Sequence, residues 1–249
     1  MNNLLDIFDA YVKNYDKNDP MIKLKYFHSY RVMDLCRQLS ESLNLNNEDT
    51  YLAMIIGLLH DYARFEQWTK YKTYSDYKSV DHGNLAVKIL FDNNEIEKFN
   101  IDKKYYSIIY NAIKYHNKYS YPENLDERSK LFCDLIKDAD KIDIFYLYSI
   151  GDLNLIGDDN NISREIEKQF YENKLIKKED IINSNEKVIL QLAMIFDLNF
   201  DYSFNYLKEN KIIESLFKRI KNKEKFENYF EYVKELIEKR EKEYVRKKI

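Results

Sequence analysis

Four histidines and a few aspartates are the residues of this chain whose types and spacing could carry chemistry. The 249 residues contain only 4 His, and one of them, His60, is followed directly by Asp61. Adjacent residues at the end of a helix point about 100° apart. An imidazole and a carboxylate in that arrangement can therefore converge only on something that lies between their directions, and a cation would fill that position.

Similar residues elsewhere complete two ligand sets. A first ion would take His28, His60, Asp61 and Asp140. These nitrogen and oxygen ligands suit Fe, Mn, Co, Ni or Zn. A second ion would take His82 and His116, with Asp61 as a bridge, which is the usual way to hold two ions about 3.5–4 Å apart for hydrolysis. Because a lone histidine near a helix end is more often a cap or a hydrogen-bonded polar group, the prediction depends on the whole set.

Helices must position these residues. Apolar residues make up 45% of the chain, charged residues 33%, and there are only 4 Gly and 2 Pro, which predicts an all-α fold. Apolar side chains at intervals of three to four residues predict helices. The predicted ranges are 22–43, 51–62, 82–91 after a cap at Ser79 or Asp81, 103–115 and 127–149. Residues 66–80 read as a loop that could contain one short turn, and three or four further helices are expected over 162–249. The pair at 60 and 61 thus ends an apolar, buried helix.

The loop GDLNLIGDDNN, residues 151–161, contains two of the four glycines and is the best candidate for a domain boundary. It predicts a metal-binding catalytic domain over residues 1–155 and a C-terminal helical extension over 156–249 packed on it. One continuous domain is the alternative.

Composition also excludes several classes of protein. The net charge of −3 offers no broad cationic face for duplex nucleic acid. The longest apolar run is far shorter than the ~20 residues that span a bilayer, and the start lacks the basic and apolar regions of a signal peptide. Cys36 and Cys133 are isolated in apolar helical pattern, which indicates reduced core thiols. We therefore expect a cytoplasmic protein without a membrane partner.

In this order the residues resemble the HD superfamily of metal-dependent phosphohydrolases. The matching segments are FHSYRVMDLCRQLSESL, GLLHDYARFEQ, SVDHGNLAVKIL, AIKYHNK and IKDADKIDIF. They cover about residues 20–150 and resemble the six-ligand, two-metal branch, which implies the same two ligand sets. The resemblance favours Asp140 over Asp138, because the family places its last Asp between a small residue and a basic one. The segment HNKYSYP lacks the doubled His and the Gly-Tyr-Pro loop of the cyclic-dinucleotide branch, which argues against cyclic di-GMP as the substrate.

The resemblance implies an HD-domain helical bundle that hydrolyses a phosphomonoester, phosphodiester or phosphoanhydride bond, in a small substrate such as a nucleotide, by attack of a metal-activated water. Two divalent transition-metal ions are expected, with Mg as a further candidate. Asp61 and Arg64 would be catalytic. Arg64, three residues after Asp61, would donate to a phosphate, or would instead contact the last carbonyls of its helix. Lys78 and Lys141 are weaker candidates for phosphate contacts.

Two other readings stay open. The first is a non-catalytic HD-type module that binds metal or nucleotide as a sensor or interaction unit. The second is a plain helical interaction protein whose histidines are incidental. Homo-oligomers are compatible with each reading.

Overall fold

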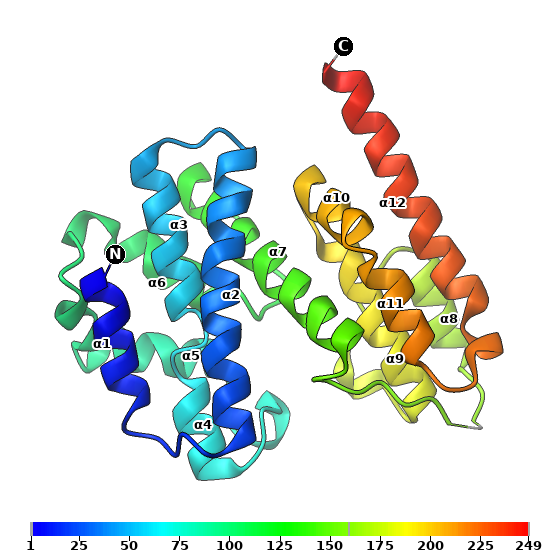
Figure 1. Cartoon of the computed structure of the whole chain (residues 1–249), viewed down its shortest axis with the longest axis horizontal. Coiled ribbons are helices and arrows are strands. Elements are labelled where there is room, and N and C mark those ends of the chain that lie inside the picture. The colour runs from blue at the N-terminus through cyan, green and yellow to red at the C-terminus, as the bar shows by residue number, and fades with distance from the viewer. Residues whose placement is uncertain (1, 159, 249) are drawn as a thin grey trace. The chain divides into compact units, whose positions relative to one another are not determined.

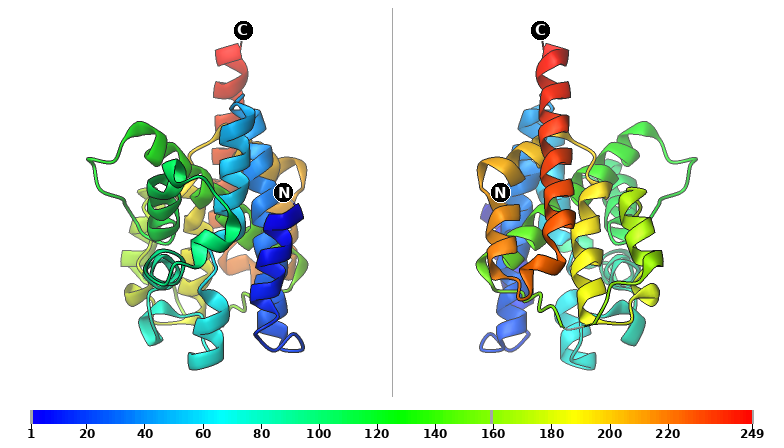
Figure 2. Two further views of the ribbon diagram at one scale, coloured as in Figure 1. Left: turned by 90° about the vertical axis from the view of Figure 1, so that its left-hand side faces the viewer. Right: turned by 90° about the vertical axis from the view of Figure 1, so that its right-hand side faces the viewer.

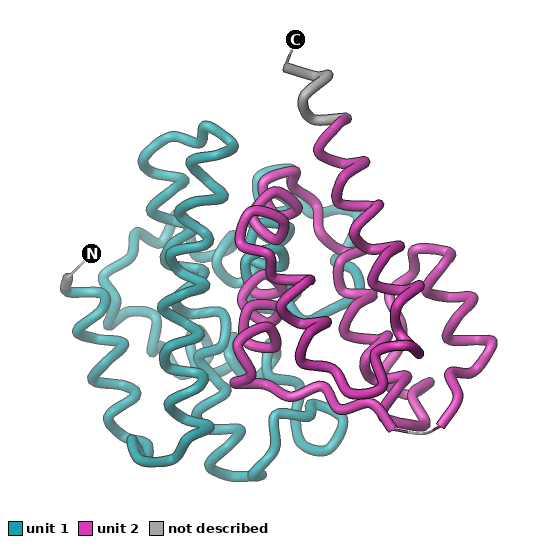
Figure 3. The backbone as a smooth tube through the Cα atoms, turned by 45° about the vertical axis from the view of Figure 1, so that its right-hand side comes forward, with its two compact units in different colours: residues 1–139 teal, residues 140–249 magenta. Residues whose placement is uncertain are grey.

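The computed structural model describes residues 2–158 and 160–248, and every regular element in them is a helix (Figure 1). The predicted all-α class is confirmed. None of the helices in these residues is long and apolar enough to cross a membrane. The chain divides into two compact units, residues 1–139 and 140–249 (Figure 3).

Unit 1 contains the helices that carry the histidines. They are α1 (Asn2–Val12), α2 (Pro20–Ser42), α3 (Asn47–Leu59), α4 (Arg64–Tyr71), α5 (His82–Val87), α6 (Tyr106–Tyr115) and the first half of α7 (Glu127–Ile150). After α5 the chain continues as a π-helical turn over Lys88–Asp92. The loop predicted over residues 66–80 is wrong in its first part, because α4 occupies it.

Helices α2 and α3 lie side by side (Figures 1 and 2). Each begins at a cap: the side chain of Asp19 accepts from the Met21 amide before α2, and that of Asn46 accepts from the Asp49 amide before α3. Between them, Asn44 takes the left-handed conformation at φ 55° that ends α2. The chain therefore turns back on itself within a few residues.

Gly57 lets the two helices approach closely. A Cβ at this position of α3 would lie 2.8 Å from the Cα of Met33 and 2.9 Å from the Sγ of Cys36, both on α2. No real side chain tolerates contacts that short without a shift of the backbone. The absence of a side chain at Gly57 thus sets the spacing between the helix that carries His28 and the helix that ends at His60.

Helix α1 anchors the turn that follows α3. The ring of Tyr11 stacks on that of Tyr62 with centroids 3.7 Å apart, and its hydroxyl donates to the Tyr62 carbonyl at 3.0 Å. Phe8 and Phe65, both fully buried, complete this aromatic cluster. Tyr62 directly follows the His60–Asp61 pair. The backbone of the pair is therefore fixed by α3 before it and by the contacts of Tyr62 with Tyr11 after it.

Unit 2 has its own hydrophobic core. It contains the second half of α7, then α8 (Arg164–Tyr171), α9 (Ser184–Leu192), α10 (Asp201–Glu209), α11 (Ile212–Arg219) and α12 (Glu227–Lys248). Phe145 of α7 belongs to this core together with Phe170 and Phe230. The predicted boundary at residue 155 lies in the loop after α7, whereas the unit boundary lies within the helix, because the second half of α7 packs into the core of unit 2.

Candidate metal centre

The four histidines are all buried, and each is placed by a different helix of unit 1. His28 lies on α2 and His82 begins α5. His60 and His116 are the residues that cap the carboxyl ends of α3 and α6. Four histidines far apart in the sequence are thus brought to the ends and faces of neighbouring helices.

His60 and His116 are oriented in the same way. In each, the ring Nδ1 lies 2.7 Å from the carbonyl oxygen three residues earlier, that of Gly57 and that of Ile113. A carbonyl oxygen can only accept, so Nδ1 carries the proton and donates it. In the neutral ring, Nε2 is left with its lone pair, which is the form that binds a metal.

His82 is oriented by a carboxylate instead. Its Nδ1 lies 2.6 Å from Oδ2 of Asp76. Burial alone would raise the pKa of Asp76, but the bond from His82 and the charge of Arg64 outweigh burial and lower it, so Asp76 is an anion that accepts. Burial, with the nearby charge of Arg64, lowers the pKa of His82 to about 3. At neutral pH, His82 is therefore an uncharged ring with its proton on Nδ1.

Gly83 permits the contact between the start of α5 and the end of α6. A Cβ there would lie 2.7 Å from Oδ1 of Asn117 and 2.9 Å from the carbonyl oxygen of Lys114. The neighbouring rings of His82 and His116 meet as a result, with their Nε2 atoms 2.9 Å apart. On the other side of the centre, Nε2 of His28 lies 3.2 Å from Nε2 of His60.

Asp61 lies between the two pairs of imidazoles. Its Oδ2 is 3.4 Å from Nε2 of His28 and 3.5 Å from Nε2 of His60. Its Oδ1 is 3.5 Å from Nε2 of His82 and 3.8 Å from Nε2 of His116. One carboxylate thus presents one oxygen to each pair.

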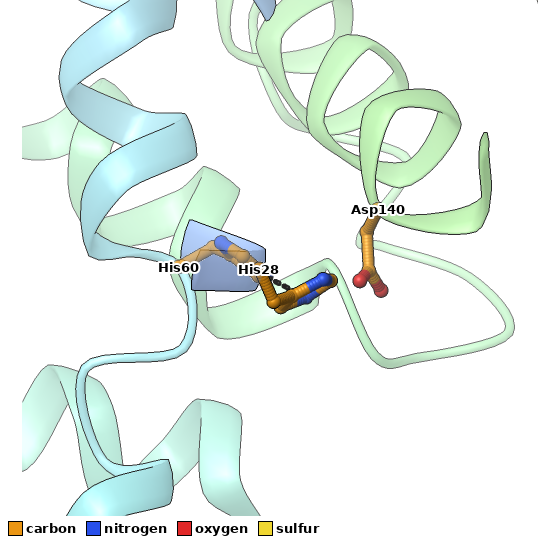
Figure 4. Close-up of side chains that lie close together, drawn as sticks. All are labelled: His28, His60 and Asp140. Atoms are coloured by element: carbon orange, nitrogen blue, oxygen red, sulfur yellow. Dashed lines mark hydrogen bonds between the residues drawn. The ribbon is translucent and has the colours of Figure 1, made fainter. Parts of the chain in front are cut away.

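Two groups of these side chains have the spacing of metal ligands. His28, His60 and Asp140 form one, and His60, Asp61 and His116 form the other, each with ligand atoms within 4.8 Å of one another. Figure 4 shows the side chains of the first group, His28, His60 and Asp140, which lie close together. Asp140 directly follows Ala139 on the uninterrupted helix α7. Within the described residues, neither group includes Asp138.

The donor set fits a divalent transition metal. Imidazole nitrogens and carboxylate oxygens are the ligands that Fe, Mn, Co, Ni and Zn share. The short Nε2 to Nε2 distance between His82 and His116 supports the same conclusion, because both rings carry their Nδ1 proton toward another acceptor. Two lone pairs that face each other repel, and a cation between ligands converts that repulsion into attraction.

Two cations compensate the charge of Asp61. Lys25 Nζ lies 2.6 Å from its Oδ2, and Arg64 Nε donates to its Oδ1 at 3.2 Å. Burial works to raise the pKa of this carboxyl, but Lys25, the neighbouring His60 and Arg64 together hold it well below its usual range. Asp61 is therefore ionised and ready to bind a metal without first losing a proton.

The three residues predicted to contact phosphate have different surroundings in the structure. Arg64 opens α4 with its guanidinium directed inward, where Nη1 donates to Gln67, to the Tyr74 carbonyl and to Asp76. Lys78 is exposed. Lys141 is mostly buried and pairs with Asp197 at 2.7 Å within unit 2.

Lys25 and Asp76 lie beside the ligands and were not predicted as part of the site. Gln67 links Asp76 to the segment that follows it. Lys25 precedes His28 by one helical turn, so the spacing of three residues could have identified it. Asp76 lies in an irregular segment where no periodicity points to it. Gln67 is fully buried and donates to Asp76, Ser79 and the Val80 carbonyl, which only the tertiary structure reveals.

Comparison with known families agrees with this geometry. The family model named HD domain matches residues 26–144, the stretch that contains all six ligand-type residues. No curated protein and no solved structure matched the chain. The family match and the buried His and Asp cluster that it spans together identify residues 26–144 as an HD domain.

Proposed function

We propose that the chain is a metal-dependent phosphohydrolase with two ions, acting on a small phosphate ester or anhydride such as a nucleotide. The observation that carries the proposal is the position of Asp61. Its two oxygens face two separate pairs of Nε2 atoms at 3.4–3.8 Å, which is the arrangement that a bridging carboxylate needs.

The ligands divide accordingly. The first ion would be held by His28, His60, Asp61 and Asp140, and the second by Asp61, His82 and His116. Divalent ions held by these residues would supply Lewis acidity and activate water at neutral pH. The family match supports this chemistry, because HD domains bind divalent metals and belong to the metal-dependent phosphohydrolases.

The chain's own residues prepare the site for a phosphate. Lys25 and Arg64 lie on opposite oxygens of Asp61 and bring two positive charges to it. Metal ions bound to Asp61 would neutralise part of its charge. Lys25 and Arg64 would then be able to attract the anionic substrate more strongly. We therefore retain Arg64 as a substrate contact and add Lys25, with Lys78 and Lys141 as more distant candidates. The buried rings of the four histidines exclude bulk water and so strengthen every charge interaction in the centre.

The proposal is tested with protein loaded with Mn²⁺ or Fe²⁺ and a panel of phosphate compounds. The panel contains nucleoside mono- and triphosphates, dinucleoside polyphosphates, cyclic dinucleotides and an aryl phosphodiester. We expect metal-dependent release of product from at least one class, abolished in Asp61→Asn and retained to within a few fold in Asp34→Asn, which changes an exposed carboxylate on α2.

The non-catalytic alternative gives a different result. A sensor would hold stoichiometric metal and bind a nucleotide in calorimetry, yet release no product from any member of the panel. That result would overturn the proposed hydrolase activity. Protein that binds no transition metal would overturn the metal centre itself.

A further inference from the structure

Asp76 accepts hydrogen bonds from His82 and from several side chains around it. Its Oδ2 accepts from Nδ1 of His82 at 2.6 Å and from Nδ2 of Asn117 at 3.0 Å. Its Oδ1 accepts from Nε2 of Gln67 at 3.0 Å and from Nη1 of Arg64 at 3.2 Å. Four donors from three parts of unit 1 thus fix one side chain, which is itself about a quarter exposed.

His82 needs an acceptor of the kind that His60 and His116 find in their own helices. His60 and His116 stand at carboxyl ends, where a carbonyl three residues earlier is within reach. His82 is the first residue of α5, and an amino end offers free amide groups rather than carbonyls. The acceptor for its Nδ1 proton must therefore come from another segment, and the short helical turn Asp76–Lys78 supplies it.

The bond to Asp76 decides which nitrogen of His82 faces the centre. A neutral imidazole has one proton, and a carboxylate behind Nδ1 holds that proton there. Nε2 is then left with its lone pair, 3.5 Å from Oδ1 of Asp61 and 2.9 Å from Nε2 of His116. Without Asp76 the proton could move to Nε2 and block the ligand position.

We propose that Asp76 is a positioning residue for the second ion, because its carboxylate fixes both the proton and the ring direction of His82. The inference rests on the proposed two-ion function. A carboxylate behind a metal-binding histidine orients the ring and makes it a stronger base, and its loss commonly weakens metal binding by about 10- to 100-fold. Arg64 extends this arrangement, because its guanidinium donates to Asp61 and to Asp76 at once and so ties the bridging carboxylate to the positioning one.

The first test measures metal binding. Metal-free protein is titrated with Co²⁺ by calorimetry, and the bound metal is counted after dialysis. We expect two ions in the wild type. In Asp76→Ala, one ion is expected to bind about 10- to 100-fold more weakly, while the affinity for the other changes by less than a factor of three.

Ser79→Ala is the matched control. The Ser79 hydroxyl accepts from Gln67 and donates to the Ser75 carbonyl, so its loss loosens the same segment without touching His82. We expect both ions to bind Ser79→Ala as they bind the wild type. Equal weakening in the two variants would show that order in the segment, rather than the carboxylate, supports the ion, and would overturn the inference.

The outcomes separate the inference from the function on which it rests. Two ions in the wild type with unchanged binding in Asp76→Ala would overturn the role of Asp76 and leave the two-ion function standing. Fewer than two ions in the wild type would overturn the two-ion function, and the role of Asp76 with it.

The second test needs no metal. Long-range ¹H–¹⁵N spectra of protein labelled at histidine nitrogens show only four rings, which His→Gln variants assign. We expect the wild type and Ser79→Ala to show His82 with its proton on Nδ1, and Asp76→Ala to show a shift of that proton toward Nε2. An Nδ1 proton on His82 that persists unchanged in Asp76→Ala would contradict the inference, even if the variant had lost stability.

Discussion

The Nε2 atoms of His82 and His116 lie 2.9 Å apart although both rings donate their Nδ1 protons to other acceptors, Asp76 and the Ile113 carbonyl. With both protons on Nδ1, neither Nε2 has a proton for a mutual hydrogen bond, and both lone pairs are available to a cation. The same holds for the centre as a whole, where an ionised Asp61 lies among four buried imidazoles. Binding of a cation should therefore stabilise the fold.

The first prediction concerns metal and stability. A ligand that binds only the folded state stabilises it by about 2.7 kcal/mol when its concentration is 100 times Kd. We expect Mn²⁺, Co²⁺ or Zn²⁺ to raise the melting temperature of chelator-treated protein and EDTA to reverse the rise, measured by calorimetry. Ca²⁺ prefers oxygen ligands and serves as the control, with a much smaller expected shift. Equal shifts for Ca²⁺ and Co²⁺ would contradict a site built mainly from imidazoles.

The second prediction concerns the bridge. Asp61→Asn removes the charge that faces both imidazole pairs, so both ions should be lost together. We expect each affinity to fall by more than about 100-fold, since loss of even an outer partner of a ligand commonly costs 10- to 100-fold. Circular dichroism should show that the helices persist. Asp34→Asn, which changes an exposed carboxylate on α2, should bind both ions normally. Loss of one ion alone in Asp61→Asn would argue against a bridge.

The third prediction concerns the close approach of α2 and α3. Alanine favours a helix over glycine by about 1 kcal/mol, yet in Gly57→Ala the new methyl group meets the backbone of Met33 at 2.8 Å. We expect a net loss of about 1–3 kcal/mol in the free energy of unfolding by urea, as in other overpacked cores. The affinity for the ion that we assign to His28 and His60 should fall more than the affinity for the other ion. Thr50→Ala on the same helix is the control. A stabilised Gly57→Ala variant would show that the helices separate at little cost.

The fourth prediction concerns pH and unit 2. Glu186 is fully buried and accepts from the amides of Ser163 at 3.0 Å and Ile182 at 2.9 Å. Burial opposes its charge, but these bonds outweigh burial and lower its pKa from 4.5. Its carboxylate therefore stabilises the fold above pH 4.5, and this contribution is lost as the pH falls below 4.5 toward the folded pKa. Glu186→Gln should cost about 1–3 kcal/mol at pH 7 and progressively less toward pH 3 in urea titrations. A difference from wild type that does not change with pH would refute the assignment.

Periodicity predicted the long helices of unit 1 because their apolar faces are regular. Helices α2, α3 and α7 were expected within a few residues of their actual ends. Helix α4 was missed because its sequence RFEQWTKY is largely polar, and only Phe65 and Gln67 of it are buried. Its formation depends on contacts of Phe65 with α1, which local pattern does not contain.

The candidate ligands could be predicted because histidine is rare in this chain and its order along the sequence is informative. The residues that orient them could not. Asp76 is one of many acidic residues in a polar segment, and its bonds to His82, Arg64 and Asn117 join positions up to 41 residues apart. Spacing predicted that Arg64 lies on the same side as Asp61, but not that its guanidinium would also bind Gln67 and Asp76.

The positions of His60 and His116 at the carboxyl ends of α3 and α6 have an electrostatic consequence. The aligned peptide dipoles of a helix place about half a negative charge at that end. Two such ends meet at Asp61, because both imidazoles face its oxygens. The backbone therefore attracts positive charge to this point before any ligand bond forms, and bound metal ions would make the approach of an anionic substrate more favourable.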